Sequence, residues 1–377
     1  MKILLITQQL AAYRSGVGTY TMNLVQGLLA RGHRLTIILP YRQVQPIPDL
    51  DFITVSPSRI DPTPGGWFSL GASFARVLRK IQGRFDVVHF TDAREAWCCG
   101  KGATPVTGMI NDAYALDWIK PGYPRRAYSD RFLRGMYYAL LRRLEKFTYP
   151  RFDALMANSA YVKREITAGY GMPPQGVSIV HYGLAHPAAP AKTVLAGKPA
   201  VLFLGGTFHR KGLGVLIEAA ALLAPGLPDI HLHVVGEDRN RPAFVELAAR
   251  RRMTERVTFH GWMPNEAARG MLAGADIFVL PSVTEGFGLV LLEAMQLDTP
   301  CVATREGGAR EVFKPGMEAI FVDPMSIHET AHAIERIATD DGVATALRQN
   351  GRRAAARFTP SAMAERTEAV WDSLKPH

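Results

Sequence analysis

The sequence has few of the features that mark secreted, metal-binding or membrane-spanning proteins. Its 377 residues include three cysteines, of which Cys98 and Cys99 are adjacent and Cys301 stands alone. This arrangement provides neither a disulfide framework nor the spacing of a metal site. The apolar runs, such as residues 3–6 and 35–39, are far too short to span a bilayer, and no charged-then-apolar leader precedes the first strand. These absences favour a cytoplasmic protein without structural zinc.

The composition also lacks the bias of disordered or repetitive proteins. Hydrophobic residues make up 47% of the chain and charged residues 21%, which is ordinary for a globular protein. No internal repeat of about 20 to 50 residues is visible. A chain of this length exceeds what one hydrophobic core usually organises, so we expect two domains.

The net charge of +10 comes entirely from the first half of the chain. Residues 1–185 contain 23 lysines and arginines against 12 aspartates and glutamates, and the remainder contains 21 against 22. The first half is therefore expected to face an anionic partner.

Two stretches of the chain begin in the same way, with an apolar strand, a glycine-bearing loop, a helix and a second strand. The first cycle covers residues 2–7, 11–18, 19–31 and 34–39, and the second has its strands at 200–205 and 230–235 around a helix at 214–223. Each cycle is a βαβ unit, and two of them predict two doubly wound, Rossmann-like domains with parallel sheets. Further strands are expected at 86–90, 106–110, 154–157, 177–181, 257–260, 277–280, 300–303 and 319–322.

The boundary between the domains is expected in residues 183–198, which are rich in Ala and Pro and carry no periodic apolar pattern. We therefore predict a first domain over 1–185 and a second over 186–359. The last segment, 360–377, has apolar residues at helical spacing, namely Met363, Ala364, Ala369, Val370 and Leu374. Such a helix can cap either domain, and we assign it to the first.

The most informative motif is PSVTEGFGLVLLEAM, residues 281–295. A strand that ends at Leu280 leads into a loop with Gly286 and Gly288 and then into a helix. These glycines let the backbone approach a ligand, and the start of the helix offers free N–H groups to an anion such as a diphosphate. Glu285 and Glu293 flank the helix start, so one can reach a sugar ring and the other a ribose. A surface loop with an ordinary capping arrangement is the alternative.

A second motif, LGGTFHRKGL over residues 204–213, places Gly206, Arg210 and Lys211 between a strand and a helix. Two adjacent cations at the carboxyl edge of a parallel strand can neutralise the charge on a departing diphosphate, which makes a metal ion unnecessary. A solvated basic loop is the commoner role of such a pair, but it does not account for the neighbouring glycines.

Near the N-terminus, Gly16 and Gly18 precede a predicted helix. The third glycine of a dinucleotide-binding motif is missing, and residues 40–42 lack the acid expected after the second strand, so a nicotinamide oxidoreductase is disfavoured. A loop that borders a sugar or phosphate explains these glycines, and a simple tight turn is the alternative.

Together these motifs, with Gly307, Gly308 and Glu311, resemble family 4 of the retaining glycosyltransferases over nearly the whole chain. The resemblance implies the GT-B fold, in which two Rossmann-like domains flank an interdomain cleft, with an acceptor-binding first domain and a nucleotide-sugar donor-binding second domain. It implies that Glu293 binds the ribose, Glu285 a hydroxyl of the donor sugar, and Arg210 and Lys211 the diphosphate. It also implies that the amides of residues 287–289 (Phe287, Gly288, Leu289) bind phosphate. Finally, it implies that Gly261, Trp262 and Met263 bound the base pocket and that Gly16 and Gly18 border the diphosphate.

Two departures from the family pattern concern the sugar site. Many members carry a His-Asp pair after the strand at 106–110, where this chain has Asn111 and Asp112, so the histidine's contact is either made by Asn111 or lost. Many members also have an arginine where this chain has Gly206, and Arg210 is then expected to supply that charge. Asp112 is a candidate for holding the acceptor hydroxyl, with a helix N-cap as its alternative role. His89, at the end of a strand, is either a sugar contact or a core histidine.

Residues 118–152 contain nine lysines and arginines and nine aromatic residues against two acids. Basic heads interleaved with amphipathic rings suit the headgroups of an anionic membrane or a lipid-linked acceptor. A solvated helix whose aromatic residues belong to the core is the alternative, and no recognised nucleic-acid module accompanies the charge.

The sequence thus predicts a metal-independent, retaining glycosyltransferase without a cofactor. The donor is a UDP- or GDP-sugar, and the acceptor is a hydroxyl of a saccharide or lipid-linked molecule in cell-surface polysaccharide or lipopolysaccharide synthesis at the cytoplasmic face of the inner membrane. A nucleotide-sugar epimerase of the same fold and a non-catalytic sugar-nucleotide binding protein are the alternatives.

Overall fold

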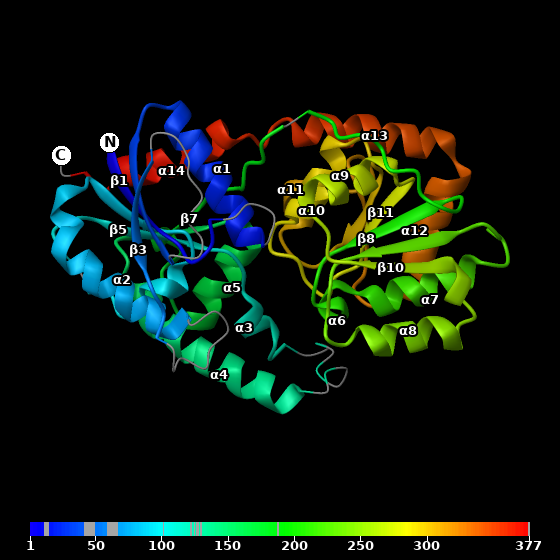
Figure 1. Cartoon of the computed structure of the whole chain (residues 1–377), viewed down its shortest axis with the longest axis horizontal. Coiled ribbons are helices and arrows are strands. Elements are labelled where there is room, and N and C mark those ends of the chain that lie inside the picture. The colour runs from blue at the N-terminus through cyan, green and yellow to red at the C-terminus, as the bar shows by residue number, and fades with distance from the viewer. Residues whose placement is uncertain are drawn as a thin grey trace. The chain divides into compact units, whose positions relative to one another are not determined.

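The computed structural model of the chain describes residues 1–10, 15–40, 50–58, 67–100, 102–120, 123, 125, 128, 130–186 and 188–375. By the contacts between its residues, the chain divides into two compact units. The first contains residues 1–120, 132–185 and 358–377, and the second contains residues 121–131 and 186–357. Each unit has one parallel sheet with helices packed against it (Figure 1), which confirms the prediction of two α/β domains with parallel sheets.

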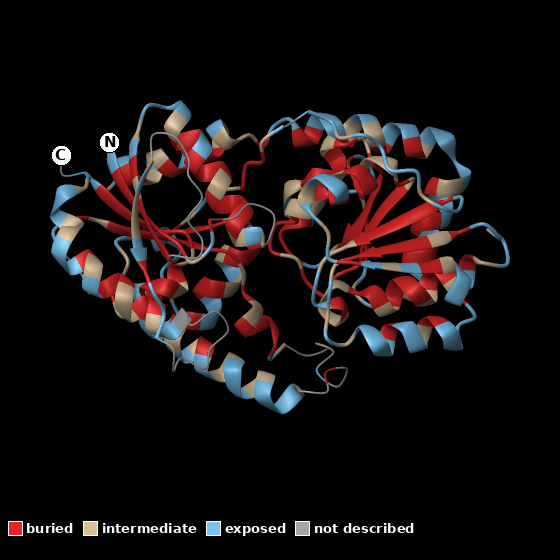
Figure 2. Ribbon diagram, viewed as in Figure 1, coloured by how far each residue is buried: buried red, intermediate tan, exposed pale blue. Residues whose placement is uncertain are grey.

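The first unit is built on a sheet with the strand order β3-β2-β1-β4-β5-β6-β7, in which all neighbours are parallel. Its strands are largely buried (Figure 2) and mostly apolar, and Ile3 to Ile6 of β1 are completely buried. In chain order the main elements are β1 (Lys2–Ile6), α1 (Gly16–Ala30), β2 (Arg34–Pro40), β3 (Leu50–Val55), α2 (Trp67–Ile81), β4 (Val87–Phe90), β5 (Val106–Ile110), α3 (Tyr114–Asp117), α4 (Arg131–Thr148), β6 (Ala154–Ala157), α5 (Ala160–Tyr170) and β7 (Val177–Ile179).

The last helix, α14 (Pro360–Asp372), belongs to the first unit and packs against α1. Gly27 of α1 makes this approach possible, because a Cβ atom there would lie 2.2 Å from the carbonyl oxygen of Pro360. At the other end of the helix, the buried Trp371 donates a hydrogen bond from its indole Nε1 to Thr107 Oγ1 of β5 at 3.0 Å. The C-terminal helix therefore completes the core that the first strands begin.

The second unit is built on a sheet with the order β10-β9-β8-β11-β12-β13, again entirely parallel. The strand order reverses direction between β8 and β11, as it does between β1 and β4 in the first unit. Its main elements are β8 (Ala200–Leu204), α6 (Phe208–Lys211), α7 (Leu213–Leu223), β9 (His231–Val235), α8 (Arg241–Arg250), β10 (Val257–Gly261), α9 (Asn265–Gly274), β11 (Ile277–Leu280), α10 (Leu289–Gln296), β12 (Cys301–Thr304), α11 (Ala309–Val312), β13 (Ile320–Val322), α12 (Ile327–Thr339) and α13 (Asp341–Ala355).

Several elements differ from the sequence prediction, among them the short helix α6, which contains Arg210 and Lys211 where a loop was expected. Helix α1 begins at Gly16 and not at Thr19, because the side chain of Ser15 caps it by accepting a hydrogen bond from the Gly18 amide. Gly16 and Gly18 therefore lie in the first turn of the helix, whereas residues 11–14 of the expected loop lie outside the described residues. Strand β3 was not predicted at all. In the part of the chain that the structure describes, no helix combines the length and the apolar character needed to cross a membrane.

Candidate functional site

The carboxyl ends of β8 and β11 lie next to each other where the strand order of the second sheet reverses. The loops that leave such neighbouring strands run to opposite sides, which opens a crevice outside the strand ends where doubly wound sheets bind ligands. Both glycine-bearing motifs of the sequence follow these two strands. The structure therefore brings the residues of the two motifs together.

The loops after β8, β11 and β12 hold one another through backbone contacts. The amide of Val283 donates to the carbonyl of Arg210 at 2.8 Å, and the amide of Gly308 donates to the carbonyl of Glu285 at 2.8 Å. Gly307 has a φ of +117°, and a Cβ atom there would lie 2.1 Å from the carbonyl oxygen of Glu285. Glycine is therefore required where the loop after β12 passes over the backbone of Glu285. This close contact fixes the position of the loop that carries Glu285.

Lys211 and Glu285 form an ion pair within this site. Lys211 Nζ lies 2.5 Å from Glu285 Oε2, each side chain is 12% exposed, and Ser282 Oγ donates to the same carboxylate oxygen at 3.4 Å. Burial alone would raise the pKa of Glu285, but the charges of Lys211 and Arg210 outweigh it and hold that pKa below its usual value. Burial lowers the pKa of Lys211, and its partner Glu285 opposes this change. The Glu285 carboxyl is therefore held in its charged form by the pair.

Glu293, on the second turn of α10, is a buried carboxyl of a different kind. Its side chain belongs to the buried polar set, and among the described residues no hydrogen bond to its carboxyl group is found. Burial raises its pKa to about 7, against which the charge of Arg269 acts only weakly. A buried acid without a hydrogen-bond partner costs stability, and such groups are concentrated at functional sites.

The amino-terminal end of α10 is open to an anion. The helix starts after Gly288, which has a φ of +90°, and no side chain caps it. The first amides of a helix have no partner within the helix, and the helix dipole adds partial positive charge there. Gly288 lies three residues after Glu285, so this end of the helix belongs to the same loop as the ion pair.

Two further loops complete the carboxyl edge of this sheet. After β8, Gly206 is exposed and Arg210 Nη2 lies 3.2 Å from Thr207 Oγ1. At the end of β10, Gly261 has a φ of +74° and its carbonyl accepts a hydrogen bond from the amide of Gly236 at 2.8 Å. The neighbouring Trp262 is 55% exposed, and Met263 is half-buried. The second motif and the 261–263 loop thus lie at the same sheet edge as Glu285.

The first-unit candidates are placed differently. His89 is fully buried, and its ring nitrogens lie 3.1 Å from Tyr20 Oη and 2.9 Å from Thr107 Oγ1. Burial lowers its pKa to about 3, so it is a neutral core histidine, and the alternative of a sugar contact is corrected here. Asn111 donates to the carbonyl of Thr91 at 2.9 Å and accepts from Tyr182 Oη at 2.5 Å. Its amide is thereby committed to structural contacts.

Asp112 accepts a hydrogen bond from the amide of Tyr114 on its Oδ1 at 3.1 Å and also pairs with Arg94, whose Nη2 lies 2.6 Å from its Oδ2. The N-cap of α3 is Ala113, and no side chain caps this helix, so Asp112 is not its N-cap; the ion pair with Arg94 was missed by the sequence analysis. Arg94 lies four residues after β4, and the signal for it was the charged run of residues 92–95 directly after a buried strand.

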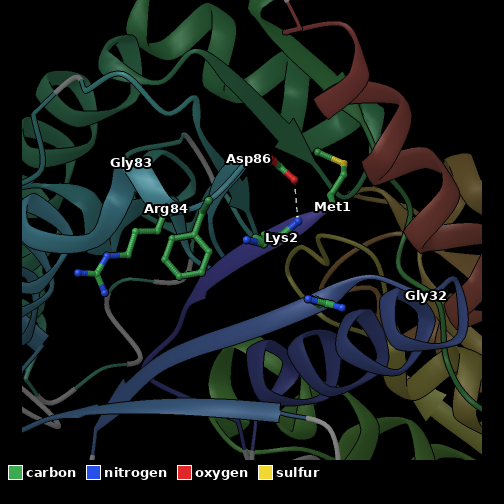
Figure 3. A pocket seen from close by; sticks show the side chains of 8 residues that line it. Met1, Lys2, Gly32, Gly83, Arg84 and Asp86 are labelled. Atoms are coloured by element: carbon green, nitrogen blue, oxygen red, sulfur yellow. Dashed lines mark hydrogen bonds between the residues drawn. The ribbon is translucent and has the colours of Figure 1, made fainter.

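A metal site and a surface pocket of the first unit are less well supported as functional sites. Among the described residues, no group of three or more His, Cys, Asp or Glu side chains could hold a metal ion. An open pocket of about 410 Å³ lies at the amino-terminal edge of the first sheet, where Lys2, Arg34, Arg84 and Asp86 line it (Figure 3). Within it the Lys2 amide donates to Asp86 Oδ2 at 2.7 Å. Because doubly wound sheets bind ligands at the opposite edge, we assign no function to this pocket.

Comparison with protein families gives two matches that together cover most of the chain. A model described as Glycosyltransferase Family 4 matches residues 14–186, and one described as Glycosyl transferases group 1 matches residues 187–354. Among curated proteins, the chain is similar to the lipopolysaccharide core biosynthesis glycosyltransferase LpsE of Rhizobium meliloti, with 35% identity over 156 residues, 41% of this chain. It is also similar to the 2-deoxystreptamine N-acetyl-D-glucosaminyltransferase of Niallia circulans, with 33% identity over 170 residues, 45% of this chain. The matched stretch spans 44% of each of these relatives.

Two solved structures have the same fold over their whole length. Sucrose-phosphate synthase of Thermosynechococcus elongatus superposes with a TM-score of 0.80 at 20% identity, covering 99% of both chains. HepE of Anabaena, solved in complex with UDP-glucose, superposes with a TM-score of 0.72 at 18% identity, covering 99% of this chain and 100% of that one. The chain therefore shares its fold with both of these proteins.

Proposed function

Because the chain belongs to family 4 of the glycosyltransferases, we propose that it transfers a sugar from a nucleotide-diphosphate sugar to a hydroxyl of a saccharide or lipid-linked acceptor. The observation that carries this proposal is the grouping of three features at the switch point of the second sheet. These are the Lys211–Glu285 ion pair, the buried Glu293 without a hydrogen-bond partner, and the uncapped start of α10. Together they offer a cation, two carboxylates and the first amides of α10 to a ligand that has both phosphates and hydroxyls.

Each part of a nucleotide sugar has a counterpart in this proposal. Glu293 accepts hydrogen bonds from the ribose hydroxyls, and Glu285 accepts one from the donor sugar. Lys211, Arg210 and the amides of residues 287–289 bind the diphosphate. Gly206, Gly286 and Gly261 to Met263 leave room for the phosphates and the base. HepE, which has the same fold, was solved with UDP-glucose, which supports a UDP-sugar as the first donor to test.

In the proposed reaction the acceptor oxygen attacks the anomeric carbon on the face from which the diphosphate leaves. The new glycosidic C–O bond forms as the bond to the diphosphate breaks, and the proton of the acceptor hydroxyl passes to a phosphate oxygen. The products are a glycoside with retained configuration and a nucleoside diphosphate. Lys211 and Arg210 stabilise the negative charge of the leaving group, so electrostatic stabilisation lowers the barrier without a metal ion.

A thermal-shift screen against UDP-glucose, UDP-N-acetylglucosamine, UDP-galactose and GDP-mannose tests the donor site. A nucleotide sugar that binds the native state raises the melting temperature by mass action. Lys211→Ala should reduce the affinity of the responding donor by about 30- to 100-fold, because a charge-assisted contact to phosphate is lost. Lys314→Ala, at an exposed lysine of the same unit, is the matched control. Absence of any shift with all four donors would contradict the proposal.

Turnover then separates the proposed function from its alternatives. A transferase releases nucleoside diphosphate only when an acceptor is added and continues in the presence of EDTA. An epimerase converts the donor without any acceptor, and a binding protein leaves the donor intact.

We further propose that the protein attaches to an anionic membrane surface, at the cytoplasmic face of the inner membrane, through helix α4. Of its 18 residues only Leu141, Glu145 and Thr148 are buried. Five large apolar side chains of the helix are more than half exposed, namely Phe132, Leu133, Met136, Leu140 and Phe147. Most of them recur at helical spacing and form one stripe, with Arg131, Arg143 and Lys146 exposed on the same helix.

Part of the aromatic content of the 118–152 segment belongs to the core. Residues 121, 122, 124, 126, 127 and 129 of this segment lie outside the described residues. Trp118, Tyr128 and Tyr149 are buried, as the alternative interpretation expected. The exposed stripe of α4 is not explained in this way. An amphipathic helix with exposed basic residues suits the headgroup layer of anionic lipids, which binds both its apolar and its charged side chains.

Vesicle flotation tests this attachment. The protein should float with vesicles that contain phosphatidylglycerol and much less with pure phosphatidylcholine. The double variant Leu133→Ser, Leu140→Ser should lose most of this binding, whereas Leu222→Ser, at an exposed leucine of the second unit, should retain it. Equally low binding to both vesicle types would contradict the proposal.

A further inference from the structure

The loop between β8 and α6 contains a residue with a strained backbone. Thr207, the last residue before α6, has a φ of +53° and a ψ of +58°, which places it in the left-handed region. In the described part of the chain, four residues other than glycine have a positive φ, and Thr207 is the only one of them with a branched Cβ. Branched side chains are unfavourable in this region, and such strain is found mainly at functional sites.

Contacts on both sides of Thr207 hold it in this conformation. The amide of the next residue, Phe208, donates to Asp238 Oδ2 in the loop after β9 at 2.7 Å. Asp238 is itself fixed, because its Oδ1 accepts hydrogen bonds from the backbone amide and the side-chain amide of Asn240 at 2.8 and 2.9 Å. The carbonyl of Thr207 accepts the Lys211 amide at 3.0 Å, which closes the single turn of α6. The surrounding structure therefore prevents the relaxation of Thr207.

The far end of α6 is fixed as well. The carbonyl of Arg210 accepts a hydrogen bond from the Val283 amide of the loop after β11 at 2.8 Å. Gly212, which ends the turn with a φ of +80°, passes so close to Pro281 that a Cβ atom would lie 2.1 Å from the Pro281 carbonyl oxygen. Because both ends of α6 are held, a change in the conformation of Thr207 cannot be absorbed by a shift of the whole turn.

The side chain of Thr207 contacts Arg210, which lies three residues further along on the same side of the turn. Thr207 Oγ1 donates to the carbonyl of Gly206 at 2.7 Å and accepts from Arg210 Nη2 at 3.2 Å. The first of these bonds fixes the direction of the hydroxyl, so that its lone pairs face the guanidinium. Arg210 in turn acts on the ion pair of the site, because its charge lowers the pKa of both Lys211 and Glu285.

We infer that Thr207 is a positioning residue of the donor site: its strained conformation and its hydroxyl hold the guanidinium of Arg210 where the diphosphate binds. The inference rests on the proposed function, in which Arg210 binds the diphosphate in place of the arginine that many family members have at the position of Gly206. Glycine would adopt this φ without strain, so the threonine costs stability and adds a hydroxyl. A long side chain that is already held loses less rotational freedom when the ligand binds.

Thr207→Gly tests the inference, because its two expected effects have opposite signs. The variant should melt at least as high as the unaltered protein without ligand, because the strain is relieved. It should nevertheless bind the responding nucleotide sugar about tenfold more weakly in titration calorimetry, with UDP-glucose, UDP-N-acetylglucosamine, UDP-galactose and GDP-mannose as probes. Thr207→Ser keeps the hydroxyl and should bind within about threefold of the unaltered protein. Arg252→Gly, at an exposed residue of the same unit with a φ of +57°, is the matched control and should bind the donor normally.

A double-mutant cycle separates positioning from a merely structural role. Arg210→Ala should weaken donor binding about 30-fold, and adding Thr207→Gly should weaken it by less than about twofold more, because no guanidinium is left to position. Equal losses in the two backgrounds, normal donor affinity of Thr207→Gly, or a lower melting temperature of that variant would each overturn the inference and leave the proposed function intact. If the unaltered protein shows no thermal shift with any of the four donors, the proposed function fails and the inference fails with it.

Discussion

At the scale of single residues, Lys211 and Glu285 form an ion pair with each other. In the proposed function they bind different parts of the same ligand: Lys211 binds the diphosphate and Glu285 binds the sugar. Both side chains are largely buried, so removing the partner of either one leaves a poorly solvated charge, at a cost of about 3–5 kcal/mol in other proteins. A phosphate alone would draw Lys211 away from Glu285 and leave the carboxylate without a partner. A nucleotide sugar supplies a phosphate to Lys211 and a hydroxyl to Glu285 at once, so it should bind more tightly than the nucleotide without the sugar.

If Glu293 binds the donor as proposed, donor binding should depend on pH. Its pKa of about 7 means that the carboxylate form, which accepts two hydroxyl hydrogen bonds, is present at about half occupancy at neutral pH. The affinity for the responding nucleotide sugar should therefore rise with pH and be about tenfold weaker at pH 6 than on its alkaline plateau. Glu293→Gln should bind weakly at every pH, with no inflection near neutrality. Titration calorimetry with the intact nucleotide sugar measures this.

The same residue should oppose stability. Its folded-state pKa lies above the value of 4.5 for an unperturbed glutamate, so the folded state holds the proton more tightly and stability falls as pH rises between 4.5 and about 7. The loss is at most about 3 kcal/mol. Glu293→Gln should therefore melt higher than the unaltered protein at alkaline pH although it binds donor worse. Glu266→Gln, at an exposed glutamate of α9, should show neither effect. A variant with normal donor affinity would contradict the role of Glu293.

At the scale of elements, the crossing of the loops after β11 and β12 sets the position of Glu285. Gly307→Ala should weaken donor binding at least about tenfold, because the new Cβ atom would collide with the Glu285 carbonyl and displace its loop. Gly316→Ala is a matched control. Gly316 also has a positive φ, +72°, but nothing lies within 4 Å of the added atom. Both variants carry backbone strain, and only Gly307→Ala should lose the thermal shift with donor. Equal donor binding by the two variants would show that the crossing does not position Glu285.

The strands that could be predicted from the sequence are those whose residues are mostly apolar. The central strands of both sheets are almost wholly buried, and their runs rich in Ile, Leu, Val and Phe were recognised even where a His or Thr interrupts them. Strand β3 lies at the edge of its sheet, and most of its residues are only partly buried, so its apolar run is interrupted and was missed. The apolar spacing predicted helix α14 but not its anchor: Trp371 is buried, whereas Ala369 is exposed and Val370 only partly buried.

The residues of the candidate site also fall into those that could be predicted from the sequence and those that could not. Residues of the glycine-bearing motifs are brought to one sheet edge because strand, loop and helix follow one another locally. Pairings across the fold are not encoded in local spacing, so the contacts of His89 with Tyr20 and Thr107, and of Arg94 with Asp112, became visible only in the folded chain. The burial that raises the pKa of Glu293 is likewise a property of the packed helix and not of its sequence.

At the scale of the whole molecule, the two units have separate cores and should unfold in separable steps. Trp371→Ala should lower the free energy of unfolding of the first unit by about 3–5 kcal/mol and its melting temperature accordingly, because a buried indole and its hydrogen bond to Thr107 are lost. The transition of the second unit should stay in place and should be the one that a nucleotide sugar raises. Arg366→Ala, at an exposed position of the same helix, is the control. Differential scanning calorimetry measures both transitions, and an equal shift of the two would contradict separate unfolding.

The return of α14 to the first unit also decides the order in which the chain can fold as it leaves the ribosome. Residues 186–357 emerge as one continuous block and can fold while synthesis continues. The N-terminal block emerges first, but the surface around Gly27 and the place of Trp371 stay open until the last helix has been made. The second unit can therefore complete its fold before the first, which reverses the usual order of folding from the N-terminus. Until α14 is made, part of the core of the first unit remains exposed.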